Sequence, residues 1–115
     1  MPFQNNLSWV DNDTAKIVLE GELDAASATL FKDTVEKAAS GKPKRLVLHL
    51  EKLTFMASAG LRVLLGAVKA ARRLGGDLRV AAAQPRVERV LALSGFTGIL
   101  RCYPDVPSAV ASWAS

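Results

Sequence analysis

The chain has 115 residues, of which 50% are hydrophobic and 23% are charged, the balance of one globular domain rather than a disordered chain. Its formal net charge is +4, and no aromatic residues lie among the scattered basic ones, so direct nucleic-acid binding is not expected. The single cysteine, Cys102, excludes an internal disulfide and favours the cytoplasm. Without a signal peptide or an apolar run of about 18 residues, we expect a single domain over residues 1–115 and no membrane insertion.

Short apolar segments predict β-strands over residues 7–10, 16–20, 45–50, 78–82 and 99–103. The first two are separated by the polar, turn-forming residues 11–14, a spacing typical of an N-terminal hairpin. Residues 45–50 are almost continuously apolar, as expected of a strand that is covered on both faces.

Helical periodicity occurs over residues 26–40, 59–74, 85–94 and a short C-terminal stretch. In the first helix Leu30, Phe31 and Val35 are spaced to face a core. Gly41 is a typical residue just past a helix end, and Asp105 can cap the last helix.

A hairpin followed by alternating helices and strands predicts an α/β domain with a mixed β-sheet, an N-terminal hairpin and about four helices. The later strands are expected to be parallel, with right-handed crossovers that bring helix starts to the C-terminal ends of the strands. Functional loops of open α/β folds gather at that edge.

Ser58 lies where the second helix is expected to begin, and two interpretations stay open from the residues alone. Its hydroxyl could cap the helix by accepting a hydrogen bond from a backbone N–H. Alternatively the hydroxyl is exposed, and a phosphate placed on it would meet free N–H groups and the positive end of the helix dipole. Such a phosphate would not melt the helix, so any switching would come from charge and bulk presented to a partner.

The acidic residue before the first helix and the basic residues of the second helix can each be explained by structure alone, as a helix cap and as a solvated surface. Asp24 can cap the first helix. Arg62, Lys69 and Arg73 share one face of the second helix, with Gly66 between them, and can form a solvated basic stripe.

No catalytic residue and no metal site are expected. His49, the only histidine, lies in a core strand and is predicted to be a packed or edge residue. With one histidine and the lone Cys102, the sequence has no metal-ligand spacing, and it has no P-loop motif. Trp9 and Trp113 are predicted to be packing residues.

The run over residues 48–65 resembles the signature of the STAS family, in which an apolar strand leads into Asp-Ser-Ser-Gly-Leu or a close variant. Ser58 aligns with the first serine of that group, which is the phosphorylation site of the family's anti-sigma factor antagonists. Gly-Glu-Leu-Asp at residues 21–24 and Ser-Gly-Phe at residues 94–96 match two further family motifs. The three matches occur in the family's order and span nearly the whole chain.

The resemblance implies a protein-interaction module that is not an enzyme and uses no cofactor. The unphosphorylated domain would bind an anti-sigma factor, itself a serine kinase of the histidine-kinase-like ATPase fold, and so release a sigma factor. Phosphorylation of Ser58 would break the complex, a serine phosphatase would restore it, and the protein would be a monomer or weak dimer. In the family the second helix borders the partner surface, where the basic stripe could dock an acidic partner. The residues expected to bind the partner are Glu22, Asp24, Ala57, Ser58, Ala59, Gly60, Arg62, Lys69 and Arg73.

The sequence departs from the family pattern at Ala57, where the family has aspartate, and at Ala59, where it has a second serine. The first change removes a carboxylate beside the acceptor hydroxyl, where it could orient that hydroxyl or be recognised by the kinase. Two alternatives therefore stay open: a STAS module of another complex, such as a stressosome scaffold or the cytoplasmic subunit of a lipid-transporting ABC system, and a small enzyme or nucleotide-binding domain.

Overall fold

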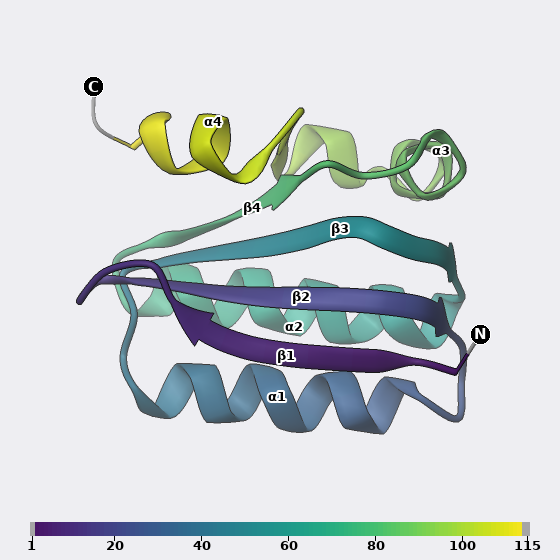
Figure 1. The fold of residues 1–115 in the computed structure, drawn as a ribbon, viewed down its shortest axis with the longest axis horizontal. Helices are drawn as coiled ribbons and strands as arrows, with labels where there is room; N and C mark the ends of the chain where they lie inside the picture. The colour runs from purple at the N-terminus through teal and green to yellow at the C-terminus, as the bar shows by residue number, and fades with distance from the viewer. Residues whose placement is uncertain (1, 114–115) are drawn as a thin grey trace.

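A computed structural model describes residues 2–113, and its strands form one mixed β-sheet in their order along the chain (Figure 1). They are β1 (Gln4–Trp9), β2 (Thr14–Leu23), β3 (Arg45–Met56), β4 (Asp77–Ala81) and β5 (Arg101–Tyr103). β1 and β2 form an antiparallel hairpin, whereas the other neighbouring strands pair in parallel. The predicted α/β class, mixed sheet and N-terminal hairpin are confirmed.

Helices cover both faces of this sheet. Within residues 2–113 the α-helices are α1 (Ala28–Ser40), α2 (Ser58–Arg73), α3 (Pro85–Leu93) and α4 (Val106–Ala111), and a short 3₁₀ helix, η1 (Phe96–Gly98), follows α3. Figure 1 shows α1 and α2 on one side of the sheet and α3 and α4 on the other. The predicted cap of the last helix is confirmed, because the Asp105 side chain accepts a hydrogen bond of 2.8 Å from the Ser108 N–H.

β2 and β3 both continue beyond the apolar segments that predict them. Their parallel pairing persists through two register shifts and ends with Glu22 opposite Phe55 and Leu23 opposite Met56. Backbone hydrogen bonding thus holds polar residues in strands that periodicity alone does not identify. As a result, the two sequence motifs of the candidate site lie side by side at one end of the sheet.

The core between the sheet and α1 and α2 shows that the prediction for Leu30 is wrong. Phe31, Val35 and Ala38 are the buried residues that fill the inward face of α1 after its first position. Leu30 lies one residue earlier, about 100° around the helix from Phe31, and its exposed fraction is 53%. Its apolar character predicts a core position, but the inward face of α1 is already filled by the other buried residues, so Leu30 faces solvent.

Gly41 ends α1 for a different reason from the predicted one. Its φ is −82°, so it is not the left-handed residue of the helix end, and Lys42 takes that conformation with φ 52°. An added Cβ on Gly41 would instead lie 2.6 Å from Cζ2 of Trp9. Packing of the Trp9 ring against the chain therefore explains the glycine.

A second, smaller cluster lies between the sheet and α4. Val47, Ala81 and Ala109 are its buried members, and Trp113 packs against them just beyond the end of α4. The guanidinium carbon of Arg79 lies 4.1 Å from the centre of the Trp113 ring, within the range of a cation–π contact. This contact joins the C-terminal segment to β4, as the predicted packing role of Trp113 requires.

We expect Gly76→Ala to lower the free energy of unfolding by about 3 kcal/mol, the upper range for overpacking, because its Cβ would lie 1.5 Å from the backbone oxygen of Lys44. Gly66→Ala is the matched control. Nothing lies within 4 Å of an added Cβ there, so the change should raise stability by about 1 kcal/mol. Urea unfolding followed by circular dichroism measures both, and equal effects would contradict the expectation.

Candidate functional site

The candidate site is built where β2 and β3 end. The Ala57 N–H donates a hydrogen bond of 2.8 Å to the Leu23 carbonyl oxygen. The Thr54 hydroxyl donates a second bond, of 3.0 Å, to the Gly21 carbonyl oxygen. These two bonds join the Gly-Glu-Leu-Asp motif to the segment that leads into α2, so both loops leave the sheet at the same edge.

Gly60 fixes the angle at which α2 leaves this edge. It is buried, and an added Cβ would lie 2.7 Å from Cδ2 of Leu23 and 3.3 Å from Cγ of Met56. Only glycine allows the first turn of α2 to pack this closely on the end of β2. Gly60 therefore serves the site through packing beneath the surface.

Ser58 is the first residue of α2 and not its N-cap. Ala57 holds the capping position, with extended backbone angles of φ −89° and ψ 170°, and has no side chain that can accept a hydrogen bond. The capping interpretation of Ser58 is therefore wrong. Its side chain is exposed on the first turn, where α2 has no acidic residue to offset the positive end of the helix dipole.

Asp24 caps the turn of residues 25–27 that leads into α1, in partnership with Ser27. It does not cap α1 itself as predicted, because α1 begins at Ala28 and its N-cap is Ser27, whose side chain makes no capping hydrogen bond to the helix. Ser27 donates to the Asp24 carboxylate from its backbone N–H (2.9 Å) and from its hydroxyl (2.8 Å). The Asp24 N–H donates in return to the Ser27 hydroxyl at 2.9 Å. This reciprocal arrangement is a capping box, and the spacing Asp-x-x-Ser was the signal for it.

The capping hydrogen bonds also set the charge of Asp24. The Ser27 N–H, followed by the Ser27 hydroxyl, lowers the pKa of the Asp24 carboxyl below its ordinary value of 3.8. Stability from this ionised carboxylate is thus present above that value and is lost as the pH falls through the lower, folded-state pKa. At neutral pH the exposed Asp24 therefore presents a negative charge beside the exposed Glu22.

The basic residues of α2 are only partly brought to the site. Arg62 lies one turn from Ser58, about 6 Å along the helix, whereas Lys69 and Arg73 lie about 16 and 22 Å away. All three are exposed, and α2 carries no acidic residue over Ser58–Arg73. A partner that contacts Ser58 and the whole stripe must therefore extend along most of α2.

A groove runs between α1 and α2 beside this stripe. Its volume is about 350 Å³. The residues that line it are mostly apolar, with three charged side chains among them: Lys32, Val35, Glu36, Ala39, Arg62, Val63, Gly66, Ala67 and Ala70. Gly66 leaves helical backbone exposed there, and nothing lies within 4 Å of a Cβ added at this position. The sequence predicts that Gly66 lies on the basic stripe. It does not predict the groove, because the groove forms only where α1 packs beside α2.

Phe55 is a further surface residue that the sequence analysis missed. It lies opposite Glu22 at the end of the paired strands, and its exposed fraction is 43%. An exposed aromatic ring next to Ser58 and Asp24 can supply buried area in a protein complex. Strand register, which decides its orientation, is not visible in the sequence.

His49 and Cys102, the histidine and the cysteine of the sequence, lie on β3 and β5. No group of three His, Cys, Asp or Glu side chains among residues 2–113 could hold a metal ion. His49 Nε2 lies 3.5 Å from a Glu51 carboxylate oxygen on the sheet. Burial, with a smaller effect of Glu88, raises the pKa of the Cys102 thiol, so its thiolate is disfavoured.

No helix within the described range has both the length and the apolar character needed to cross a bilayer.

Comparisons with known proteins agree with this architecture. A model of the STAS domain family matches residues 10–109. The anti-sigma-F factor antagonist RsfA of Mycobacterium tuberculosis is 33% identical over 104 residues, which cover 88% of this chain and 81% of RsfA. An anti-sigma factor antagonist from Mycobacterium paratuberculosis superposes with a TM-score of 0.89 and 21% identity over 99% of this chain and 96% of that one. SpoIIAA from Bacillus, solved in its phosphorylated form, has a TM-score of 0.74 and 25% identity over 96% of this chain and 98% of its own.

The chain therefore belongs to the STAS domain family, as its motifs predict. The structural likeness to the mycobacterial antagonist rests on the fold, since the sequences are only 21% identical.

Proposed function

We propose that this chain is an anti-sigma factor antagonist, which acts by binding an anti-sigma factor and carries out no chemistry itself. The observation that carries the proposal is the exposed Ser58 on the first turn of α2, beside the capped Asp24 and the end of β3. By the resemblance of residues 48–65 to the STAS signature, Ser58 aligns with the serine that is phosphorylated in the family's antagonists. The name of the 33% identical relative RsfA supports the same function.

The finer mechanism follows from the position of Ser58. A serine kinase of the histidine-kinase-like ATPase fold, which is the anti-sigma factor itself, would transfer a phosphoryl group from ATP to the Ser58 hydroxyl. The phosphate adds close to two negative charges at neutral pH. Because it lies at the positive end of the α2 dipole, it leaves the fold intact and acts on the complex through repulsion and bulk. A serine phosphatase in the same compartment, the cytoplasm, would restore the binding form.

The partner surface centres on the exposed residues around Ser58. Glu22 and Asp24 supply negative charge from the end of β2, and Phe55 supplies apolar area from β3. Arg62 supplies positive charge from the first turns of α2. Such a mixed surface fixes the orientation of a partner through charge complementarity.

Ser58→Glu should weaken binding of the anti-sigma factor at least about tenfold, or about 1.4 kcal/mol, whereas Ser58→Ala should bind like the unmodified chain. Thr97→Glu is the control, because it adds the same charge at η1, beside the Ile99 carbonyl that Arg72 contacts at the far end of α2, about 21 Å along the helix from Ser58. Calorimetric titration with the anti-sigma factor captured from native lysate measures all three. A loss in Ser58→Ala as large as in Ser58→Glu would show that the hydroxyl itself is required and that charge is not the switch.

Ala57→Asp should speed phosphorylation of Ser58, because it restores the carboxylate that the family places beside the acceptor. The same change fills the N-cap position and should stabilise the chain by about 1 kcal/mol, so misfolding does not obscure the result. The measurement is a time course with the cognate anti-sigma kinase, with mass spectrometry of the Ser58 peptide.

Ala57→Asn is the matched control, because it caps α2 without adding charge. Equal, rapid labelling of the unmodified chain and Ala57→Asp would show that Ala57 is a neutral substitution. Labelling of neither would favour the second candidate function, a STAS module of a complex such as a stressosome scaffold or a lipid-transporting ABC system.

Arg62→Glu should slow association with the anti-sigma factor about tenfold at low salt and reduce the salt dependence of that rate. Lys69→Glu is the matched change on the same stripe. We expect it to have the smaller effect, because Lys69 lies about 10 Å farther along α2. Stopped-flow rates at two ionic strengths measure both. If neither rate changes, the stripe is only a solvated face.

A further inference from the structure

β1 leaves one edge of the sheet open in an unusual form. All six residues of β1 pair with β2 without a bulge. The strand reads Gln-Asn-Asn-Leu-Ser-Trp and contains neither a charged residue nor a proline. Edge strands are normally protected from pairing with other chains by such residues, by bulges or by short length. The opposite edge is protected in this way, since β5 has three residues, begins at Arg101 and is followed by Pro104.

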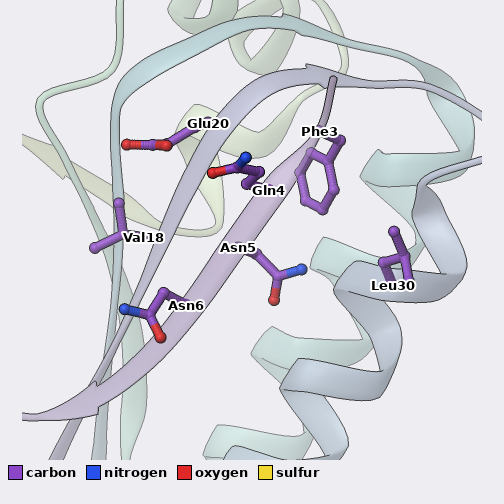
Figure 2. Close-up of a pocket in the computed structure, with 7 residues that line it drawn as sticks. All are labelled: Phe3, Gln4, Asn5, Asn6, Val18, Glu20 and Leu30. Atoms are coloured by element: carbon purple, nitrogen blue, oxygen red, sulfur yellow. The ribbon is translucent and has the colours of Figure 1, made fainter. Parts of the chain in front are cut away.

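Two hollows flank the open edge, where β1 lies beside α1. The larger one, shown in Figure 2, has a volume of about 570 Å³ and includes Phe3, Asn5 and Leu30. The other measures about 350 Å³ and is lined by residues that include Asn5 and Trp9. Leu30 and Trp9 are 53% and 44% exposed. The edge thus offers unpaired backbone together with apolar side chains, as a surface does that receives another strand.

Asn5 stands between the two hollows with an unmet hydrogen-bonding requirement. Its Oδ1 is buried and has no hydrogen-bond partner within residues 2–113. Figure 2 shows its side chain on the same side of β1 as Phe3 and Leu30. A buried acceptor without a donor destabilises the state that contains it. A donor from a second molecule would remove this penalty once the carboxamide turns its oxygen toward the open edge, since the oxygen is closed off within the single chain.

We infer that β1 pairs antiparallel with β1 of a second copy of this chain, about a twofold axis at Asn5. In an antiparallel pair, directly opposite residues lie on the same face of the sheet. The axis at Asn5 places the two Asn5 carboxamides opposite each other, Phe3 opposite Leu7, and Gln4 opposite Asn6. Rotation about the terminal torsion of Asn5 lets each carboxamide donate to the other, which satisfies both oxygens.

The alternative axes match the side chains less well. An axis at Asn6 places Asn5 opposite Leu7, and an axis at Leu7 places Asn5 opposite Trp9. Both set a carboxamide against an apolar side chain. Only the axis at Asn5 pairs apolar with apolar and amide with amide throughout residues 3–7.

Charge does not oppose this self-association. β1 is uncharged, so no like charges meet across the axis. Among the described residues, Glu20 is the charged residue that lines the larger hollow, and its carboxylate lies 3.7 Å from the Lys52 ammonium group. Lys37 is the charged residue that lines the smaller hollow, so the two hollows carry opposite charges. The dimer would have a continuous ten-stranded sheet, and it does not depend on the proposed function.

Disulfide trapping tests the axis directly. In a Cys102→Ser background, Asn5→Cys should form a covalent dimer under mild oxidation, because Cα atoms opposite each other across an antiparallel pair are about 4.5–5.5 Å apart, within disulfide range. Ser8→Cys in the same background is the matched control. Its two copies would lie about 20 Å apart in this register and should remain reduced. Equal trapping of both variants, or none of Asn5→Cys, would overturn the proposal.

The mass of the unmodified chain in solution gives a test without cysteines. Light scattering after size-exclusion chromatography should show a mass that rises toward twice that of the monomer as protein concentration increases. Asn5→Asp, which opposes two carboxylates across the axis, should weaken this association at least about tenfold, and Asn12→Asp in the hairpin turn should not. A monomer at every concentration, or a dimer insensitive to Asn5→Asp, would overturn the inference. Circular dichroism verifies that each variant folds.

Discussion

The pairing of the last residues of β2 with those of β3 is the constraint on which the site depends. It carries Leu23 beside Met56, and the hydrogen bond from the Ala57 N–H to the Leu23 carbonyl oxygen ties the start of α2 to the end of β2. Gly60 then packs on Leu23 and fixes the direction of the helix. A slip of one residue would turn every side chain of the strand end to the other face and separate these contacts. The position of Ser58 is therefore a property of sheet register more than of its own loop.

Local chemistry was sufficient to predict the order of the elements and the class of the fold. The apolar run over residues 45–50 identified the central strand, and Asp105 identified the cap of α4, because both signals lie within a few residues of the feature that they specify. Ser58 was placed at the start of the second helix in the same way. Its role in binding came from the resemblance to the STAS family, since a serine at a helix start has no specific chemistry of its own.

The features that escaped prediction depend on residues distant in sequence. Gly41 is required by the ring of Trp9, and the exposure of Leu30 follows from the face of α1 that the sheet covers. The strand ends that include Glu22 and Phe55 exist because β2 and β3 pair there, although neither strand has a regular apolar pattern at that end. Ala57 rather than Ser58 is the N-cap of α2, and its N–H is hydrogen-bonded to the carbonyl oxygen of Leu23, 34 residues earlier. These features depend on contacts that form only when the chain is folded, so no short stretch of sequence predicts them.

The location of Ser58 one residue inside α2 affects the lifetime of a modified chain. A capping residue contributes to the folding equilibrium, so a chemical change on it alters how often the chain opens to proteases. Ser58 caps nothing, and an anion at its position is tolerated by the helix dipole. A phosphate there would therefore stabilise the first turn of α2 rather than weaken it, and the modified chain would open to proteases no more often than the unmodified one. Loss of the phosphorylated form would then reflect removal of the group by a phosphatase rather than faster degradation.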